Sequence, residues 1–268
     1  ITLSSATFDG SGADTDLGLN FTSDAFASNL SVGSSTSFSG LDDAGIQLNN
    51  ESAGEVTVDG ATFADSAGDG VNITGGFGNN TAITDATFSN VSTGINVDSV
   101  SSEFNLTAHF NSFTDNTDGV LVDDSSADDV NLTFNDFVDN TDGLNVSDTS
   151  SAVNAKFNFW GDSTGPDALD QLGNDGPFST ANGFGDSVTL SGSGDANVFP
   201  FLQQSIDDFS AEQLAGDQPV LIENPAHISN ADGNQEVFVT VLDESKGITD
   251  DQVFITGDSG FNTAPNQE

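Results

Sequence analysis

The sequence contains no cysteine, methionine, tyrosine or arginine, and its only lysines are Lys156 and Lys246. Without cysteine there is no disulfide framework, and without cysteine or methionine there are no soft sulfur ligands for copper. The 43 acidic side chains give a formal net charge of −41. A surface of this sign repels nucleic acid and anionic lipid, so neither is expected as a partner.

Long apolar runs are also absent, and the first residue is Ile1 rather than methionine. No stretch has the length of a transmembrane helix or the pattern of a signal peptide, so the chain is not expected to span a membrane itself. Residues 1–8 parallel residues 56–63, so the sequence starts inside a strand. We therefore expect a mature or partial product whose first strand needs cover from upstream sequence, another subunit or a cap.

The charge imbalance indicates a protein that works in concentrated salt. Self-repulsion at this level opposes a compact fold in dilute buffer. At about 1 M salt the Debye length is about 3 Å, and most of that repulsion is screened. Disorder is the competing explanation for high charge. The regular placement of many of the 22 phenylalanines argues against it.

What the sequence does contain is an internal repeat. A motif of the form Phe-Asn-x-aromatic begins at Phe110, Phe134 and Phe157, and less similar repeats precede it. Successive anchor aromatics are 25, 25, 25, 24 and 23 residues apart, and a glycine with an aliphatic residue follows each phenylalanine anchor. The anchors are Phe38, Phe63, Phe88, Phe113, Phe137 and Trp160, with Phe8 as an earlier copy. Such a period is typical of a solenoid or a propeller.

Each repeat holds short runs in which apolar and polar residues alternate, such as Val130–Phe134 and Gly143–Ser147. This alternation predicts strands with one buried face, separated by turns rich in Asp, Asn, Ser and Gly. A propeller blade needs about 40 residues, so 24–25 residues fit one coil of a parallel β-helix better. The predicted class is an all-β solenoid in which one coil stacks on the next.

Stacking places equivalent residues directly above one another. The anchor aromatics then form a ladder inside the coil, because offset ring stacking adds stability to burial. Asn111, Asn135 and Asn158 form a second ladder, for which we expect amide hydrogen bonds at a bend. A ligand-binding role for these asparagines is the alternative.

Residues 158–166, Asn-Phe-Trp-Gly-Asp-Ser-Thr-Gly-Pro, resemble the motif that closes right-handed parallel β-helices of pectin-lyase-like surface proteins, which are abundant in haloarchaea. Residues 185–188 and 197–202 resemble the last strand and the Pro-aromatic-Leu ending of that family. The resemblance implies a right-handed parallel β-helix over residues 1–202, with the closing motif over 157–202. It implies little about activity, because this fold carries lyases, hydrolases, adhesins and structural rods.

The remainder of the chain departs from the repeat. Residues 203–218 are predicted to be a linker with one short helix over 205–214. Residues 220–222, 236–242 and 252–256 are expected strands of a partial immunoglobulin-like β-sandwich over 219–268. About 50 residues are too few for seven strands, so the others lie beyond Glu268 or come from a neighbouring subunit.

Catalytic chemistry has little support in the sequence. A lyase on this fold needs an arginine or lysine base, and Lys156 is the only cation in the repeats. Hydrolases use paired carboxylates. The adjacent pairs Asp42-Asp43, Asp123-Asp124 and Asp128-Asp129 are expected from composition alone. His109 and His227 are isolated and are interpreted as packing or surface residues. We therefore expect no catalytic residue.

Metal binding is a more open question. The repeat predicts that Asp115 stacks near Asp139, Asp118 near Asp142, and Asp98 near Asp123. Stacked carboxylates repel unless they are screened, protonated or bridged by a cation, and oxygen-rich turns suit Ca²⁺ or Na⁺. No other cofactor is expected. Solvated carboxylates in brine are the simpler interpretation.

Nine Asn-x-Ser/Thr sequons suggest an exported glycoprotein. Chance is the alternative in a chain rich in Asn, Ser and Thr. The asparagines are Asn20, Asn29, Asn50, Asn72, Asn79, Asn90, Asn105, Asn131 and Asn145.

Together these features predict a non-enzymatic extracellular protein of an extreme halophile, in a surface layer, an appendage or adhesion. Partners would be other copies or surface proteins that meet the chain ends, with glycans as a further class. A carbohydrate-active enzyme on the same rod and a halovirus fibre that binds host glycans are the alternatives.

Overall fold

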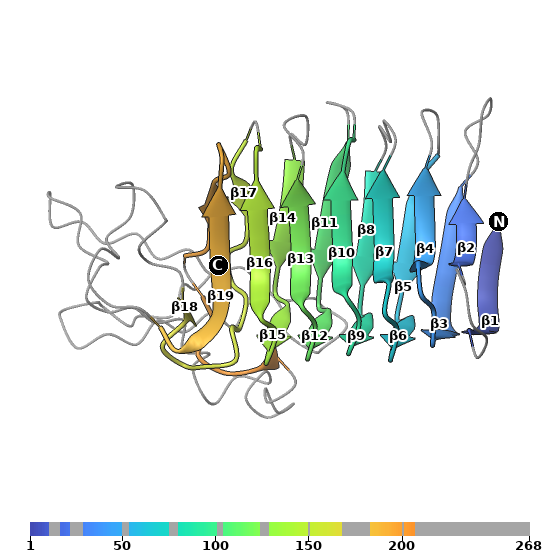
Figure 1. Ribbon diagram of the computed structural model, residues 1–268, viewed down its shortest axis with the longest axis horizontal. Coiled ribbons are helices and arrows are strands. Elements are labelled where there is room, and N and C mark those ends of the chain that lie inside the picture. Colours follow the sequence, from blue (N-terminus) through green and yellow to red (C-terminus); the bar gives the residue numbers. More distant parts are fainter. Residues whose placement is uncertain are drawn as a thin grey trace, which may run out of the picture.

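The computed structural model describes a parallel β-solenoid with almost no helix (Figure 1). It describes residues 1–10, 17–21, 29–49, 54–74, 80–100, 104–123, 129–149, 151–167, 183–199 and 201–206. The predicted β-sandwich, most of the linker and its short helix lie outside these residues, as do Asn50 and Asn79. In the described part, no helix is long and apolar enough to cross a membrane.

Two parallel sheets run the length of the solenoid. The 8-stranded sheet has, in spatial order, β18 (Pro166–Asp167), β19 (Gly185–Ser191), β16 (Asp142–Ser147), β13 (Asp118–Asp123), β10 (Thr93–Asp98), β7 (Asp69–Thr74), β4 (Ala44–Asn49) and β2 (Leu17–Phe21). The 12-stranded sheet has β15 (Asp136–Val138), β12 (Ser112–Thr114), β9 (Thr87–Ser89), β6 (Thr62–Ala64), β3 (Leu30–Ser39), β5 (Val56–Asp59), β8 (Asn80–Thr84), β11 (Asn105–His109), β14 (Asp129–Thr133), β17 (Val153–Asn154) and β20 (Ala196–Asn197), with β1 (Thr2–Asp9) beside β3.

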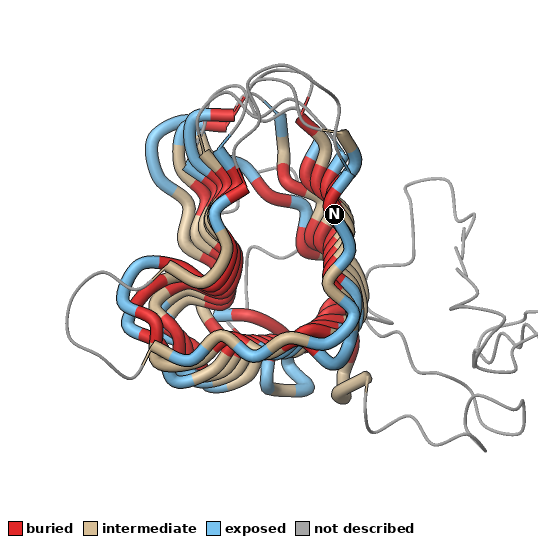
Figure 2. The backbone as a smooth tube through the Cα atoms, turned by 90° about the vertical axis from the view of Figure 1, so that its right-hand side faces the viewer, coloured by how far each residue is buried: buried red, intermediate tan, exposed pale blue. Residues whose placement is uncertain are grey.

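Each middle coil contributes one strand to the 8-stranded sheet and two short strands to the 12-stranded sheet, as β7, β8 and β9 do. Nearer the N-terminus, the single long strand β3 pairs with both β5 and β6. Strands pair with their equivalents one coil earlier and one coil later, always in parallel. Along the axis, the buried positions of successive coils superimpose and line the interior (Figure 2). The predicted stacking of 24–25-residue coils is confirmed.

The predicted aromatic ladder fills the interior. Phe63 and Phe88 are register partners, and their ring centroids are 4.8 Å apart at an interplanar angle of 5°. The same stacking, with centroids 4.7–4.9 Å apart, runs from Phe8 through every anchor to Trp160. From Phe38 onward these rings are fully buried. The ladder therefore joins coil to coil through side chains as well as through backbone hydrogen bonds.

The glycine that follows each phenylalanine anchor leaves room for the next ring. A Cβ on Gly94 would lie 2.6 Å from Cδ1 of Phe113 and 2.5 Å from the carbonyl oxygen of Gly119. Gly45, Gly70 and Gly119 meet equivalent obstacles. The repeat requires glycine here because a backbone atom and a buried ring of the next coil both occupy the space.

The predicted asparagine ladder is also confirmed. The Nδ2 of Asn111 donates to Oδ1 of Asn135 at 3.0 Å, and Asn135 donates in turn to Asn158 at 3.1 Å. Each Oδ1 also accepts a backbone N–H from the preceding coil, and each Nδ2 also donates to a carbonyl. All three side chains are buried, so the ladder provides hydrogen-bond partners for the polar groups at this bend without water.

Two columns of bends take the left-handed backbone conformation. One contains Asp65, Asn90, Asp115 and Asp139, short polar residues that tolerate it. The other carries Phe110, Phe134 and Phe157 at φ of 56–60°. A left-handed residue with a bulky side chain costs roughly 1–2 kcal/mol. Stacking of these half-buried rings, with centroids 5.9 and 5.3 Å apart, offsets part of that cost.

The first coil is open on its outer side within the described residues. There β1 pairs only with β3, and β2 pairs only with β4. Phe8 stacks on Phe38 and is only half-buried, and Ile1 is exposed. At the other end, Leu202 bridges to Phe159, and the backbone of Ile206 donates to the Asp136 carboxylate at 3.0 Å.

Candidate functional site on the outer faces of the coil

A column of half-buried carboxylates follows the outside of the 8-stranded sheet. Asp69, Asp118 and Asp142 begin β7, β13 and β16. In each case a side chain from the following coil donates to the carboxylate: Asn96 to Asp69 at 3.0 Å, Asn145 to Asp118 at 3.1 Å, and Thr189 to Asp142 at 2.7 Å. The same hydrogen bond in three places indicates a cross-coil link that repeats with the fold.

Burial raises the pKa of two of these carboxyl groups. For Asp69, burial outweighs the hydrogen bonds from Asn96 and Thr93, which lower the pKa. For Asp118, burial acts first, and the negative charge of Asp142 raises the pKa further against the hydrogen bond from Asn145. Asp69 and Asp118 therefore hold their negative charges less readily than solvated aspartates do.

The structure brings together all three predicted aspartate pairs. Asp118 is the register partner of Asp142, and Asp98 is the register partner of Asp123. Asp115 and Asp139 occupy equivalent left-handed bends of adjacent coils. Within the described ranges, no three His, Cys, Asp or Glu side chains lie close enough to hold a metal ion. The positions were predicted correctly, and Ca²⁺ or Na⁺ binding stays a prediction.

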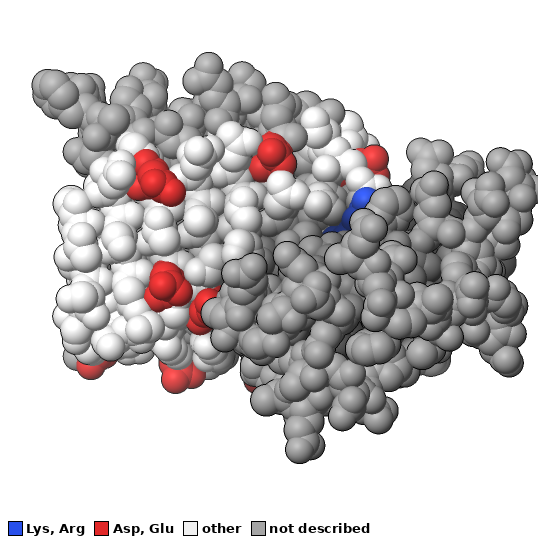
Figure 3. Space-filling view, turned by 180° about the vertical axis from the view of Figure 1, so that it is seen from behind, with Lys and Arg blue, Asp and Glu red and all other residues white. Residues whose placement is uncertain are grey.

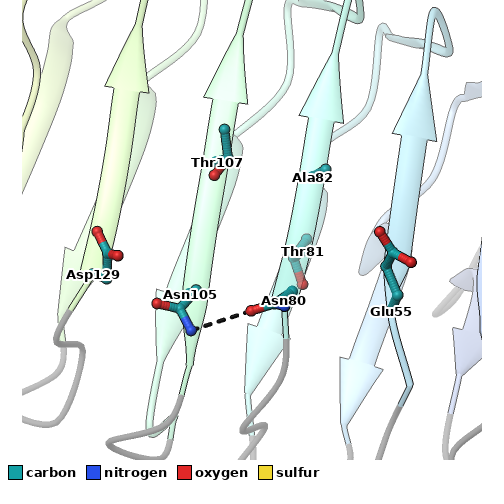
Figure 4. Close-up of a pocket in the computed structure, with 7 residues that line it drawn as sticks. All are labelled: Glu55, Asn80, Thr81, Ala82, Asn105, Thr107 and Asp129. Carbon is teal, nitrogen blue, oxygen red and sulfur yellow. Dashed lines mark hydrogen bonds between the residues drawn. The ribbon is translucent and has the colours of Figure 1, made fainter.

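The outer face of the 12-stranded sheet is hollowed by small side chains (Figure 4). The hollow, about 440 Å³, extends over β5, β8, β11 and β14, and Asn105 donates to Asn80 across it at 3.2 Å. Its carboxylates, Glu55 and Asp129, belong to coils three steps apart, which is about 14 Å at the usual strand spacing. Paired glycosidase carboxylates lie about 5–9.5 Å apart, so these two do not form such a pair.

A second hollow lies beside the outer phenylalanine column, which sequence reasoning missed. Asp85, Phe110, Ser112, Asp136 and Ile206 are among its lining residues. Asp136 is buried and accepts hydrogen bonds from the Ser205 hydroxyl and the Ile206 backbone. These bonds tie the residues after Leu202 to the side of the coil. The repeated Phe-Asn pair was the available signal for this outer column.

His109 and Lys156 lie near these aromatic rings. The His109 ring packs edge-on against Phe110 at 5.2 Å, and burial lowers its pKa against the opposing influence of Asp85. Packing or a surface position was predicted for His109, and its ring is half-buried against Phe110. Lys156 lies in the turn before Phe157.

Asp186 is the other residue that sequence reasoning did not single out. It ends a second buried ladder, in which Asn116 donates to Asn140 at 2.9 Å and Asn140 donates to Asp186 at 2.5 Å. Burial raises the pKa of the Asp186 carboxyl to about 6, although the hydrogen bonds from Asn140 lower it. The signal was present as Asp115-Asn116 and Asp139-Asn140 at the same place in two repeats.

On one face of the molecule, the acidic side chains of the described residues are separated from one another (Figure 3). On the face in Figure 3, separate carboxylates stand among uncharged residues. Asp42, Asp43, Asp123 and Asp129 of the adjacent pairs are all exposed. On this face the acidic side chains therefore do not gather into one patch (Figure 3).

A family model described as a right handed beta helix region matches residues 19–159, more than half of the chain. No curated protein and no solved structure matches the chain significantly. The matched segment begins in β2 and ends at the bridge of Phe159, so it covers the coils that carry the ladders. The chain therefore belongs to the right-handed β-helix family.

Proposed function

We propose that this protein is a non-enzymatic structural or adhesive rod on the surface of an extremely halophilic cell, in a surface layer, an appendage or a filament. The observation that carries the proposal is repetition of the outward polar links. Asn96–Asp69, Asn145–Asp118 and Thr189–Asp142 recur along the rod, whereas a catalytic centre is a single convergence of unlike groups. The net charge of −41 supports a working environment of concentrated salt.

Surface labelling tests the location directly. An antibody raised against the folded chain is applied to intact source cells and to lysed cells. Strong labelling of intact cells is the expected result, with regular spacing in electron micrographs if the rod is part of a layer or filament. Labelling only after lysis would overturn the proposal.

A carbohydrate-active enzyme is the second candidate, and one observation favours it. Asp118 and Asp142 are adjacent register partners, close to the separation of about 5 Å found in retaining glycosidases, and the pKa of Asp118 is raised. The test is release of reducing ends from a panel of acidic and neutral polysaccharides in high salt. Activity that Asp118→Asn and Asp142→Asn both abolish would establish the enzyme and remove the structural proposal.

A halovirus fibre that binds host glycans would use the same rod as an oligomer. The mass of the protein in solution, measured by light scattering in high salt, separates this role from the others. A stable trimer with affinity for host glycans would favour the fibre.

A further inference from the structure

The described sequons fall into two structural classes. Asn72, Asn105, Asn131 and Asn145 lie inside strands β7, β11, β14 and β16 and are half-buried. Asn20, Asn29 and Asn90 are exposed, and Asn90 lies at a bend between β9 and β10. In the folded rod, a modifying enzyme can therefore reach the exposed asparagines more easily than the half-buried ones.

Three of the four half-buried strand asparagines use their side-chain amides in hydrogen bonds within the fold. Asn105 donates to Asn80 at 3.2 Å, and Asn145 donates to Asp118 at 3.1 Å. Asn131 donates to Asp129 at 2.6 Å and accepts from Asn154 at 2.7 Å. For Asn72, the Oδ1 atom is buried. A substituent on Nδ2 at these positions would compete with contacts that connect the outer face.

Coil spacing adds a steric obstacle at the strand positions. Neighbouring strands lie about 4.8 Å away on both sides, so a sugar ring on a strand asparagine would press against side chains of the adjacent coils. At Asn90 the neighbours in the column are Asp65 and Asp115, both short and both exposed. A substituent can leave the rod there without crossing a strand.

The sequon Asn90-Val91-Ser92 lies at an exposed bend, with the Asn90 side chain on the surface. The backbone of Asn90 is left-handed at φ 52°, its Nδ2 donates to the exposed Asp65 carboxylate at 2.9 Å, and Val91 turns into the core. Ser92, the hydroxyl residue of the sequon, is half-buried. Aspartate adopts the same left-handed conformation at Asp65 and Asp115, so the backbone of the bend does not itself require an amide.

We propose that Asn90 carries an N-linked glycan and that the four half-buried strand asparagines, Asn72, Asn105, Asn131 and Asn145, do not. The proposal rests on the export to the cell surface proposed above. The donor is an oligosaccharide activated as a lipid-linked phosphate ester. Nδ2 of Asn90 bonds to the sugar C1 and gives up one proton, while the C1–O bond to phosphate breaks and its electron pair leaves on the phosphate. The amide keeps its second proton for Asp65.

The sequence allows each site to be measured separately. A protease that cuts before aspartate releases residues 85–97, which contain Asn90 as their only sequon, and residues 129–135, which contain only Asn131. Mass spectrometry of the full-length protein purified from its source cells should find the first peptide with added hexose or related masses. The second peptide should be unmodified.

Two variants and one matched control complete the test in the native host. Ser92→Ala removes the sequon without changing charge, and Asn90→Asp keeps a residue suited to the left-handed bend. Each should lower the intact mass by one glycan. Thr133→Ala, which removes the hydroxyl residue of the Asn131 sequon, should lower the intact mass only by the CH₂O that distinguishes threonine from alanine, with the glycan on Asn90 retained. Equal thermal midpoints in high salt would show that all three variants fold.

An unmodified peptide 85–97, or a glycan on Asn131 or Asn145, would overturn the assignment. Such a result is distinguishable from failure of the proposed function, because surface labelling of intact cells does not depend on the glycan. Labelled cells with an unmodified Asn90 would leave the structural rod in place and remove this inference alone.

Discussion

Asn140 donates its side-chain amide to the carboxylate of Asp186, with 2.5 Å between Nδ2 and Oδ2, although 46 residues separate the two in the chain. The backbone N–H of Asn140 reaches the same oxygen at 3.1 Å. Asp186 thus takes the place that an asparagine would have in the next coil. Its place in β19, which pairs with β16, puts Asp186 at the position where the ladder continues.

Replacing Asp186 with asparagine should stabilise the protein above about pH 6. The folded carboxyl has a pKa raised to about 6 by burial, from an ordinary value of 3.8. Between those values the folded state holds a proton that the unfolded state has released, so stability falls as the pH rises through this window. We expect Asp186→Asn to exceed the wild type by about 2 kcal/mol at neutral pH.

Thermal unfolding in constant high salt, from about pH 4 to about pH 8, measures this difference. Asp69 and Asp118 titrate in the same direction in both proteins, so their effect cancels in the comparison. A variant that is less stable than the wild type at neutral pH would show that the charge of Asp186 is needed.

Truncation of one ladder ring should weaken the whole rod. Phe88 is fully buried between Phe63 and Phe113, at 4.8 and 4.9 Å between ring centroids. Phe88→Ala is expected to lower the free energy of unfolding by about 3–5 kcal/mol, because it removes buried area and leaves a cavity. Thr87→Ala, at an exposed position of the same strand, should change it by less than about 0.5 kcal/mol.

Chemical or thermal unfolding in high salt provides the measurement. Equal free energies of unfolding for Phe88→Ala and Thr87→Ala would show that the stacked rings do not stabilise the coils as described.

Adding a methyl group at a glycine that precedes a buried ring of the next coil should destabilise the protein. Gly94→Ala brings Cβ against the Gly119 carbonyl and the Phe113 ring, and the carbonyl cannot move without disturbing the sheet. We expect destabilisation of about 1–3 kcal/mol, the usual range for overpacking. Gly33→Ala is the matched control, because the nearest atom to its Cβ would be 3.5 Å away.

The two alanine variants are compared by their thermal midpoints under the same conditions. Gly33→Ala should keep or slightly raise the midpoint, since alanine restricts the unfolded chain more than glycine does. Equal midpoints for both variants would contradict the close approach at Gly94.

Salt should stabilise the protein through screening. The thermal midpoint is expected to rise steadily between about 0.1 M and about 3 M NaCl, as the repulsion among 43 acidic groups is screened. Millimolar CaCl₂ at constant ionic strength tests the predicted ion sites beside Asp98, Asp115 and Asp118. A calcium-specific rise there would establish them, whereas a midpoint that is insensitive to NaCl would contradict the screening argument.

The coil could be predicted because its residues repeat. Phe63, Phe88 and Phe113 share one spacing and one environment, so a single period fixes their stacking. Asn111, Asn135 and Asn158 follow by the same logic. Repetition also predicted the adjacent aspartates, since equivalent positions of successive coils must be neighbours.

The parts that could not be predicted depend on departures from the period. Asp186 joins a ladder after a long connection, so no fixed spacing relates it to Asn140. Phe110 and Phe134 adopt a backbone conformation that phenylalanine rarely takes, and stacking between coils offsets part of its cost. Burial of the carboxyl groups on the outer sheet face depends on neighbouring side chains and not on a motif.

Since the strands of β7, β8 and β9 pair only with the equivalent strands before and after them, the rod's length is a modular quantity. Duplicating or deleting one complete coil between Phe63 and Phe113 would preserve every register and shift one end by about 4.8 Å. Gene-level gain or loss of a single repeat can therefore adjust how far this molecule reaches, while the chemistry at its two ends stays the same.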